Sequence, residues 1–332
     1  MIKLDSIKIK APTHVLNGFN SDLLERDTKH SKGVLIKDIS QIKSIDFGFN
    51  SFSVNNLTND FTMELSAKIL KSDYADGINQ NNFDRVVDAI NKNKFLNINI
   101  DAFYNSAELL RADATDNIKL DYKGNFYSDI SAIPLPNKYE ITSYNTTRNN
   151  GVVFKGKQSS FKERQIIYNK LIELNSVKSG KQFLNSVNKN KIYKDFKDTI
   201  RVEGNFTSFE KMRQYIGSNK LSDVLQSNEK PNYKLWQKIT KHTDAEILYL
   251  FDRYEGMNIR EVIRRRGLEG IIADAKFNWQ YIELWLKNKT PKTYRIHRKE
   301  FRKIYLELQL KQNRANGKHI IQLFSDALLK VA

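Results

Sequence analysis

Two separate stretches of the sequence carry side chains suited to covalent catalysis. One contains Tyr168 and Lys170, and the other contains Arg201 and Glu203. Both are predicted to be strands, the first over residues 165–173, and side chains alternate between the two faces of a strand. Tyr168 and Lys170 therefore share one face, as do Arg201 and Glu203. A phenol, an ammonium and a carboxylate on rigid strands could act as a nucleophile, its activator and a partner for a metal ion or proton.

A third stretch places acids where a buried strand would normally be apolar. Residues 109–117 are predicted to form a strand in which Asp113 shares a face with Thr115 and Asn117, while Asp116 faces the other way. The alternative is a half-exposed strand whose acids are solvated. A carboxylate from this strand becomes a candidate metal ligand only if the other two stretches lie beside it.

Positive charges gather just before the Tyr168 strand. A strand over residues 151–156 ends in glycine, and a hairpin is the simplest connection to the strand that follows. Cations and hydroxyl groups in and around this connection suit contacts with a phosphate backbone. They are Lys155, Lys157, Lys162 and Arg164, with Ser159 and Ser160 as hydroxyl donors.

The overall charge also indicates a polyanionic partner. The 332 residues include 55 Lys and Arg against 38 Asp and Glu, a formal charge of +17. Such an excess favours nucleic acid, although a basic surface without a specific partner is the alternative. The chain has no cysteine, which excludes disulfides, a thiolate zinc site and a cysteine nucleophile.

The composition predicts a soluble protein of the cytoplasm. No apolar run approaches the roughly 18 residues of a membrane-spanning helix, and the amino terminus lacks the apolar core of a signal peptide.

The pattern of apolar residues predicts an α+β fold in two domains. Residues 1–210 are expected to form an antiparallel sheet with helices on one face, including a helix over residues 83–91 and an extended segment over 95–103. Residues 211–332 show helical periodicity and are expected to form a basic, mostly helical accessory domain that binds DNA. Its helices are predicted at 221–225, 233–239, 244–254, 259–275, 279–286, 292–310 and 319–329.

Two parts of the helical half are strongly basic. Cations that recur over successive helical turns can follow phosphates, and the alternative is a charged, solvated face. The sequence does not decide which part contacts duplex DNA. The candidate DNA contacts are Arg264, Arg265 and Arg266 in the first part, and Lys292, Arg295 and Arg298 in the second.

Four short motifs follow one another along residues 60–216. They are Leu110-Arg111-Ala112-Asp113, Gly156-Lys157-Gln158-Ser159, Ile167-Tyr168-Asn169-Lys170-Leu171-Ile172-Glu173 and Arg201-Val202-Glu203. Together they resemble the motifs of replication initiators of rolling-circle plasmids and single-stranded DNA phages, in the branch without a His-hydrophobic-His metal motif.

The resemblance implies a role for each matching position. Tyr168 would attack a phosphodiester at the origin, remaining joined to the 5′ phosphate and releasing a 3′ hydroxyl. Asp113 and Glu203 match the acidic strand positions, and Lys170 and Glu173 complete the tyrosine motif. A divalent cation such as Mg²⁺ or Mn²⁺, held by carboxylates, would neutralise the phosphate oxygens.

The chain departs from this family at one position. Relatives commonly carry a second acid four residues after the first, where this sequence has Asn117. Asp116, reached through a bulge, and Glu173 are the alternative metal ligands. Tyr144 and Tyr193 are alternative nucleophiles.

The leading hypothesis is therefore a metal-dependent nickase and strand-joining enzyme that starts rolling-circle replication. Its expected partners are origin DNA, both duplex and single-stranded, together with a host helicase and polymerase. A second copy of the chain, in a homodimer, is a further candidate partner. The alternatives are a mobilisation relaxase with the same chemistry and a DNA-binding regulator without catalysis.

Overall fold

The computed structural model describes most of the chain. The described residues are 1–331 without 32–33, 94, 123–124, 134, 137, 145–149, 159–161, 242–257 and 277, and without the side chains of 44, 259 and 309–318. They divide into two compact units. Unit 1 contains residues 1–123, 137–239 and 323–332, and unit 2 contains residues 124–136 and 240–322.

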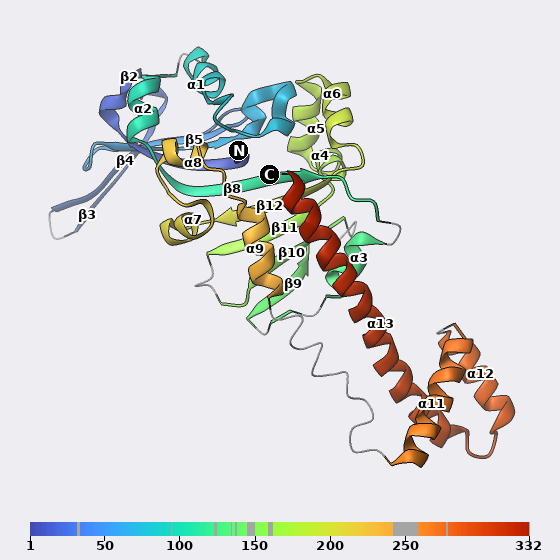
Figure 1. Ribbon diagram of the computed structural model, residues 1–332. Coiled ribbons are helices and arrows are strands. Elements are labelled where there is room, and N and C mark those ends of the chain that lie inside the picture. Colours follow the sequence, from blue (N-terminus) through green and yellow to red (C-terminus); the bar gives the residue numbers. More distant parts are fainter. Residues whose placement is uncertain are drawn as a thin grey trace. The chain divides into compact units, whose positions relative to one another are not determined.

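A ten-stranded antiparallel sheet organises unit 1 (Figure 1). Its central strands bring together segments that are far apart in the sequence, because β1 and β8 lie beside β12 and β11. The strand order is β3 (Glu25–Ser31), β4 (Val34–Asp46), β5 (Phe49–Asn55), β6 (Asp60–Ser66), β1 (Leu4–Pro12), β8 (Glu108–Ile118), β12 (Ile200–Phe206), β11 (Glu163–Tyr168), β10 (Gly151–Gly156) and β9 (Tyr139–Ser143).

Helices cover apolar parts of this sheet because their own apolar residues recur at helical spacing. In α1 (Phe83–Lys92), the buried residues are Phe83, Val86, Val87 and Ile90, so one stripe of the helix faces the core. α2 (Ile100–Ser106) follows the short strand β7 (Leu96–Ile98), which pairs with β2 (Leu16–Phe19) in a separate two-stranded sheet. Phe103 of α2 stacks on both Phe61 and Phe83.

Two groups of helices lie against the half of the sheet that holds β8, β12 and β11. α9 (Pro231–Thr240) packs on one face through Trp236, whose ring contacts Phe154 and Phe324. On the other face, Tyr74 of the 3-10 segment η3 (Ala67–Asp76) packs against Phe196 of α6 (Lys189–Phe196). The helices α4 (Lys170–Ser176) and α5 (Lys178–Asn185) continue this second group, while α7 (Phe209–Ile216) and α8 (Leu221–Leu225) precede α9.

Unit 2 is helical. It contains α3 (Phe126–Ser131), α11 (Ile259–Asp274), α12 (Trp279–Lys289) and the part of α13 (Tyr294–Val331) before residue 323. The last three share an apolar core. That core consists of Ile272, Ile282, Leu286, Phe301, Ile304 and Tyr305.

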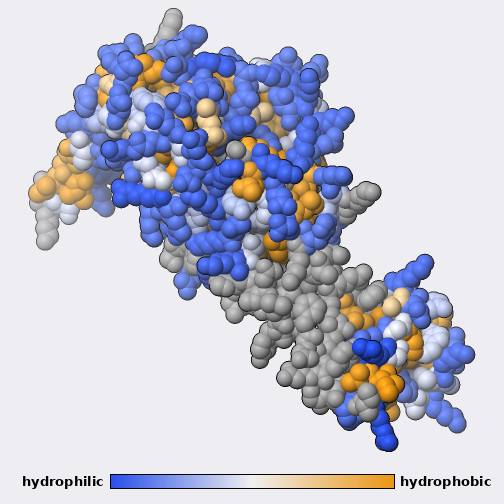
Figure 2. Space-filling view, in the orientation of Figure 1, coloured by the Kyte–Doolittle hydropathy of each residue, from blue (hydrophilic) through white to orange (hydrophobic). Residues whose placement is uncertain are grey.

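The outermost hairpin of the sheet presents apolar side chains to solvent. Val34 and Ile36 on β4 are exposed, and the polar strand β3 that pairs with β4 is exposed along its whole length. Figure 2 shows this apolar end at the left, while much of the remaining visible surface is hydrophilic. No described helix is both long enough and apolar enough to span a membrane.

The antiparallel α+β class and the helical C-terminal half predicted from the sequence are confirmed. Helices lie against both faces of the sheet and not one, because α9 and η3 pack on opposite sides of β12. The units also do not separate at residues 210 and 211, since α7, α8 and α9 belong to unit 1.

Two predicted segments have a different structure. Residues 95–103 are not one extended stretch, because α2 begins at Ile100 with Asn99 as its cap. The strand predicted over 165–173 ends at Tyr168. The helix predicted over 244–254 lies outside the described residues.

Candidate active site

The central strands place three rows of side chains on one sheet face. Tyr168 on β11 lies opposite Arg201 on β12, and Arg201 lies opposite Asn117 on β8. Two residues further along, Glu203 is opposite Thr115. Because directly paired residues in an antiparallel sheet project from the same face, these side chains can meet across the strands. The third row consists of Arg164, Asn205 and Asp113.

Tyr168 lies within a polar network although its side chain is buried. Only 1% of the residue is exposed, and its hydroxyl donates a hydrogen bond to Oε1 of Glu203 at 2.6 Å. The ammonium of Lys170 donates to the same hydroxyl at 2.9 Å. The phenol therefore has a carboxylate acceptor on one side and a cation on the other.

A change from strand to helix brings Lys170 back over the Tyr168 ring. The side chain of Asn169 accepts a hydrogen bond from the amide of Ile172 and so caps α4, which starts at Lys170. The prediction of one continuous strand was wrong because it missed this cap. Lys170 and Tyr168 still meet, and the Lys170 ammonium lies 5.3 Å from the centre of the Tyr168 ring.

Glu173 holds Lys170 instead of adding a second strand-borne acid. Its carboxylate lies 3.1 Å from the Lys170 ammonium, one helical turn away. Burial alone lowers the pKa of Lys170, but the groups around it, including the carboxylates of Asp5 and Glu173, raise that pKa well above its usual value. Lys170 is therefore a fixed positive charge beside the phenol.

Arg201 fixes the position of Glu203. Its guanidinium is fully buried, and Nε donates to Oε1 of Glu203 at 2.8 Å. Nη1 donates to Asn117 at 3.2 Å, and Nη2 donates to Asp5. The sequence also makes Arg201 a candidate DNA contact, as a cation beside the proposed site, and the structure corrects that prediction, since none of its donors reaches the surface. Arg201 is a positioning residue for the carboxylate that meets Tyr168.

Asp5 also belongs to this site, although no motif around it indicated a functional role. It lies on β1 where the pairing with β8 shifts between Leu4 and Ser6. A bulge of this kind redirects side chains that simple alternation would place elsewhere. The one available signal was an acid next to buried apolar positions in an N-terminal strand.

Burial makes the Tyr168 hydroxyl a weak acid, so a base has to take its proton before the oxygen can attack. Desolvation, followed by the negative charge of Glu203, raises the pKa of Tyr168 well above 10, while Lys170 and Arg201 lower it. The hydroxyl is therefore protonated in this structure. Its proton already points to Glu203, which is the geometry required for transfer to a general base.

Asp113 lies on the same face as Glu203, one diagonal step along the sheet. It pairs with Asn205, two residues beyond Glu203, and diagonal neighbours in a sheet lie about 7–8 Å apart. Burial, together with the negative charges of Glu203 and Asp5, raises the pKa of Asp113 to about 7 against the opposing effect of Arg111. One oxygen, Oδ1, is buried with no hydrogen-bond partner among the described residues.

The carboxylates predicted as metal ligands do not all converge. Asp116 faces the opposite side of β8, where it accepts a hydrogen bond of 2.9 Å from Asn232 on α9. Within the described part of the chain, no three His, Cys, Asp or Glu side chains are grouped to hold a metal ion. Of the predicted ligands, Asp113 and Glu203 lie on the same sheet face as Tyr168, and Oε1 of Glu203 already accepts hydrogen bonds from Tyr168 and Arg201.

A basic groove of about 650 Å³ opens next to Asp113. Lys155 and Lys157, predicted to contact DNA, both line it, and so does the predicted contact Arg164. The groove carries more cations than acids, which suits a polyphosphate chain. Its charged lining consists of Arg111, Asp113, Glu140, Lys155, Lys157, Lys162, Glu163 and Arg164, and the predicted contact Ser159 lies outside the described residues.

The two alternative nucleophiles occupy different surroundings. The ring of Tyr144 lies 4.4 Å from that of Tyr168 and helps to cover it. Tyr193 donates a hydrogen bond of 2.6 Å to Asn175. Of the three tyrosines, Tyr168 is the one whose hydroxyl contacts both Glu203 and Lys170.

The basic residues of the helical half that were predicted to contact DNA differ in whether they form ion pairs within the protein. Arg264 pairs with Glu300 at 2.6 Å, and Arg265 pairs with Glu269 and Glu307. Arg298 pairs with Glu283 on α12. Arg266, Lys292 and Arg295 are exposed.

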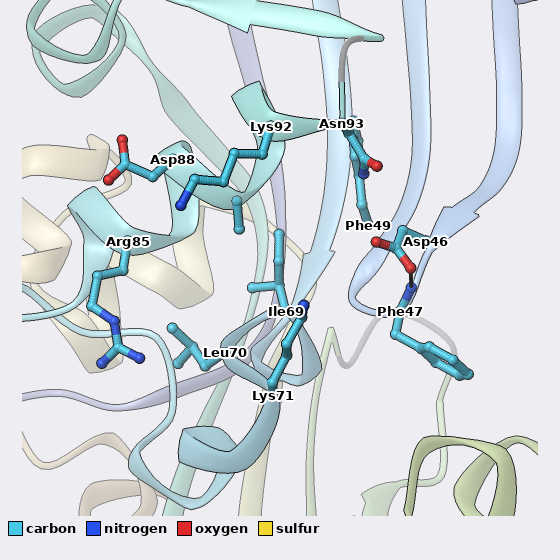
Figure 3. Close-up of a pocket in the computed structure, with 11 residues that line it drawn as sticks. Asp46, Phe47, Phe49, Ile69, Leu70, Lys71, Arg85, Asp88, Lys92 and Asn93 are labelled. Atoms are coloured by element: carbon cyan, nitrogen blue, oxygen red, sulfur yellow. Dashed lines mark hydrogen bonds between the residues drawn. The ribbon is translucent and has the colours of Figure 1, made fainter. Parts of the chain in front are cut away.

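Another cavity, of about 390 Å³, lies between α1, η3 and the turn from β4 to β5 (Figure 3). Lys71, Arg85 and Lys92 contribute positive charge, and Asp46 accepts a hydrogen bond from the amide of Phe47. None of the described residues that line this cavity is a tyrosine. It is therefore separate from the candidate nucleophile.

No protein-family description and no curated protein matches the sequence. One similar solved structure is a rolling-circle replication initiator protein from Geobacillus stearothermophilus. The sequence identity is 8%, the match covers 68% of this chain and 78% of that chain, and the TM-score is 0.28. A likeness of this degree does not establish the family, so the function has to be inferred from the geometry of the site.

Proposed function

We propose that this protein nicks one strand of origin DNA through Tyr168 and thereby starts rolling-circle replication. The observation that carries the proposal is the contact of one hydroxyl with both Glu203 and Lys170, at 2.6 and 2.9 Å. A nucleophile beside a proton acceptor and a cation is the arrangement that activates a phenol. The basic groove next to Asp113 supports a nucleic-acid substrate.

In the proposed step, the Tyr168 oxygen forms a bond to phosphorus while the bond from phosphorus to the 3′ oxygen breaks. The phenol proton moves to Glu203, and the departing oxygen takes a proton from solvent to become a 3′ hydroxyl. Lys170 stabilises the negative charge that develops on the phenol oxygen. The phosphotyrosyl ester retains the energy of the broken bond, so attack by a 3′ hydroxyl can rejoin the strand.

Asp113 and Glu203 are the residues that would hold a divalent cation. The partnerless Oδ1 of Asp113 and the raised pKa of this carboxyl indicate a site that gains from a positive charge. Bound Mg²⁺ or Mn²⁺ would neutralise phosphate oxygens near the nucleophile.

Access to Tyr168 requires local movement. The residue is buried, and the ring of Tyr144 lies against it. We propose that the substrate strand displaces Tyr144 as it enters from the groove. The free 3′ end would then be available to a host polymerase, and a host helicase would unwind the duplex.

The burial of Tyr168 is also the observation that favours the alternative, a DNA-binding regulator in which this tyrosine is only packed. Incubation with Mn²⁺ and supercoiled DNA of the replicon that encodes the protein separates the two. The nickase predicts nicked circles and a covalent 5′ adduct that Tyr168→Phe abolishes and Tyr193→Phe retains. DNA binding without a nick, or an unchanged adduct in Tyr168→Phe, would contradict the proposal.

A further inference from the structure

α12 and α13 are joined by a short turn within the three-helix core of unit 2. α12 ends at Lys289 and α13 begins at Tyr294, so Thr290–Thr293 form the connection. Two helices joined by a turn of 3–4 residues are the basis of the helix-turn-helix, whose second helix enters the major groove of DNA.

Contacts between α12 and α13 fix which side of α13 is buried. The rings of Trp285 and Phe301 lie 6.2 Å apart, and Tyr294 donates a hydrogen bond of 2.8 Å to Glu283. Phe301, Ile304 and Tyr305 belong to the shared core. The opposite side of α13 therefore faces away from the core of unit 2.

That outer side carries a straight stripe of cations. Arg295, Lys299 and Lys303 are four residues apart, which places them one above the other on a helix, and all three are exposed. Among the described residues, none of the three has an ion-pair partner. Ile296 is 69% exposed beside the stripe and offers an apolar contact of the kind that a thymine methyl group makes.

The other basic cluster of unit 2 serves a different purpose. Arg264 and Arg265 on α11 reach across to Glu300 and Glu307 on α13, so their charges hold the two helices together. Arg298 is paired with Glu283 of α12 in the same way. The contrast between paired and unpaired cations selects the outer side of α13 as the surface for a polyanion.

We propose that the N-terminal half of α13 binds duplex DNA in the major groove, with Arg295, Lys299 and Lys303 facing the DNA. An α-helix fits this groove, and cations along its outer side contact phosphates and base edges. The binding itself does not require nicking. Its role in bringing the origin to Tyr168 rests on the proposed function.

The test measures how the full chain binds a fluorescent random-sequence duplex of roughly 20 base pairs, about two helical turns. Fluorescence anisotropy is recorded between about 50 and 200 mM salt. The variant R295A/K299A/K303A removes the stripe, and R260A/R264A/R266A removes the same number of cations from α11. All six positions are exposed, and circular dichroism confirms that both variants fold.

The stripe variant should bind the duplex about tenfold or more weakly, and its log–log salt dependence should be shallower by about three. The α11 variant should retain most of the wild-type affinity. Methyl green, which occupies the major groove, should compete, and netropsin, which occupies the minor groove, should not. Equal binding by the stripe variant and the wild type, an equal loss in the α11 variant, or competition by netropsin alone would overturn the inference.

A second readout separates this inference from the nicking mechanism. Each variant is incubated with Mn²⁺ and the single-stranded origin sequence, for which duplex recognition is not needed. If nicking by Tyr168 is correct, the stripe variant still forms the covalent adduct. If neither the wild type nor either variant forms an adduct, while the stripe variant alone loses duplex binding, then DNA binding by α13 is supported and the proposed function is contradicted.

Discussion

At the Tyr168 end of the sheet face, the buried charges of Lys170, Arg201 and Glu203 each meet an opposite charge. At the Asp113 end, a carboxylate oxygen is left without a partner beside an open, basic groove. Buried, paired charges fix geometry, because removing one partner leaves the other uncompensated. Asp113 meets Arg111 through Oδ2 at 3.6 Å, and its partnerless Oδ1 can receive a further cation. Under the proposed function, the enclosed end carries the nucleophile and its base, and the open end binds the DNA strand and, together with Glu203, the cation.

Glu203→Gln provides the strongest test of the enclosed end. The amide cannot accept the phenol proton, and loss of a general base typically lowers the rate by about 10²–10⁴-fold. Single-turnover cleavage of single-stranded origin DNA measures this change, and near-ultraviolet circular dichroism checks that the fold is intact. A folded variant with the wild-type rate would remove Glu203 from the chemistry.

Arg201→Ala tests whether the enclosed end depends on paired charges. The substitution leaves Glu203 and Asp5 without their shared cation, and the free energy of unfolding should fall by about 3–5 kcal/mol. Arg164→Ala is the matched control, because this exposed arginine belongs to the same sheet face and lies in the groove. The control should change stability by about 0.5 kcal/mol or less. Urea unfolding that gave equal losses would erase the difference between the two ends.

Asp113→Asn tests the open end through pH. The pKa of Asp113 is about 7 in the folded protein against 3.8 ordinarily, so the folded state retains this proton to a higher pH than the unfolded chain. Without a divalent cation, this group destabilises the fold progressively between about pH 4 and 7, and fully above that range. The variant should therefore gain up to about 4 kcal/mol at about pH 8 and nothing below about pH 4.

Urea unfolding in the presence of a chelator checks this pH dependence. Added Mn²⁺ should stabilise the wild type at the higher pH and leave Asp113→Asn unchanged. A gain of the same size at both pH values would show that Asp113 is not the titrating group.

Substitution of the groove lysines should have the smallest effect of these changes. K155A/K157A removes two cations from the open end and should reduce the salt dependence of single-strand binding by about 1.4, with stability changed by about 0.5 kcal/mol or less. K178A/K181A, on the exposed side of α5, is the charge-matched control. A larger loss of binding in the control would show that single-stranded DNA does not bind in this groove.

Alternation within single strands was enough to predict that Arg201 and Glu203 share a face and that Asp116 faces away from Asp113. The sequence could not show that β12 lies between β8 and β11, because strand order depends on packing between distant segments. It also could not place Asp5, whose contact with Arg201 spans 196 residues and depends on a bulge. Burial of Arg201 was missed for the same reason, since an arginine in a basic chain resembles a surface contact until its partners are known.

The local error at Lys170 has a different origin. Asn169 can cap a helix, but the apolar residues around it also fit a strand, and short apolar runs do not distinguish the two. The cap decides the outcome, because it ends β11 at Tyr168 and turns Lys170 back onto the phenol.

The most direct measurement is mass spectrometry of the covalent complex after digestion with protease and nuclease. The account predicts that a nucleotide 5′ phosphate is joined to the peptide that contains Tyr168. Attachment to Tyr144 or Tyr193 would contradict it, and so would the absence of any covalent adduct from a reaction that produces nicked DNA.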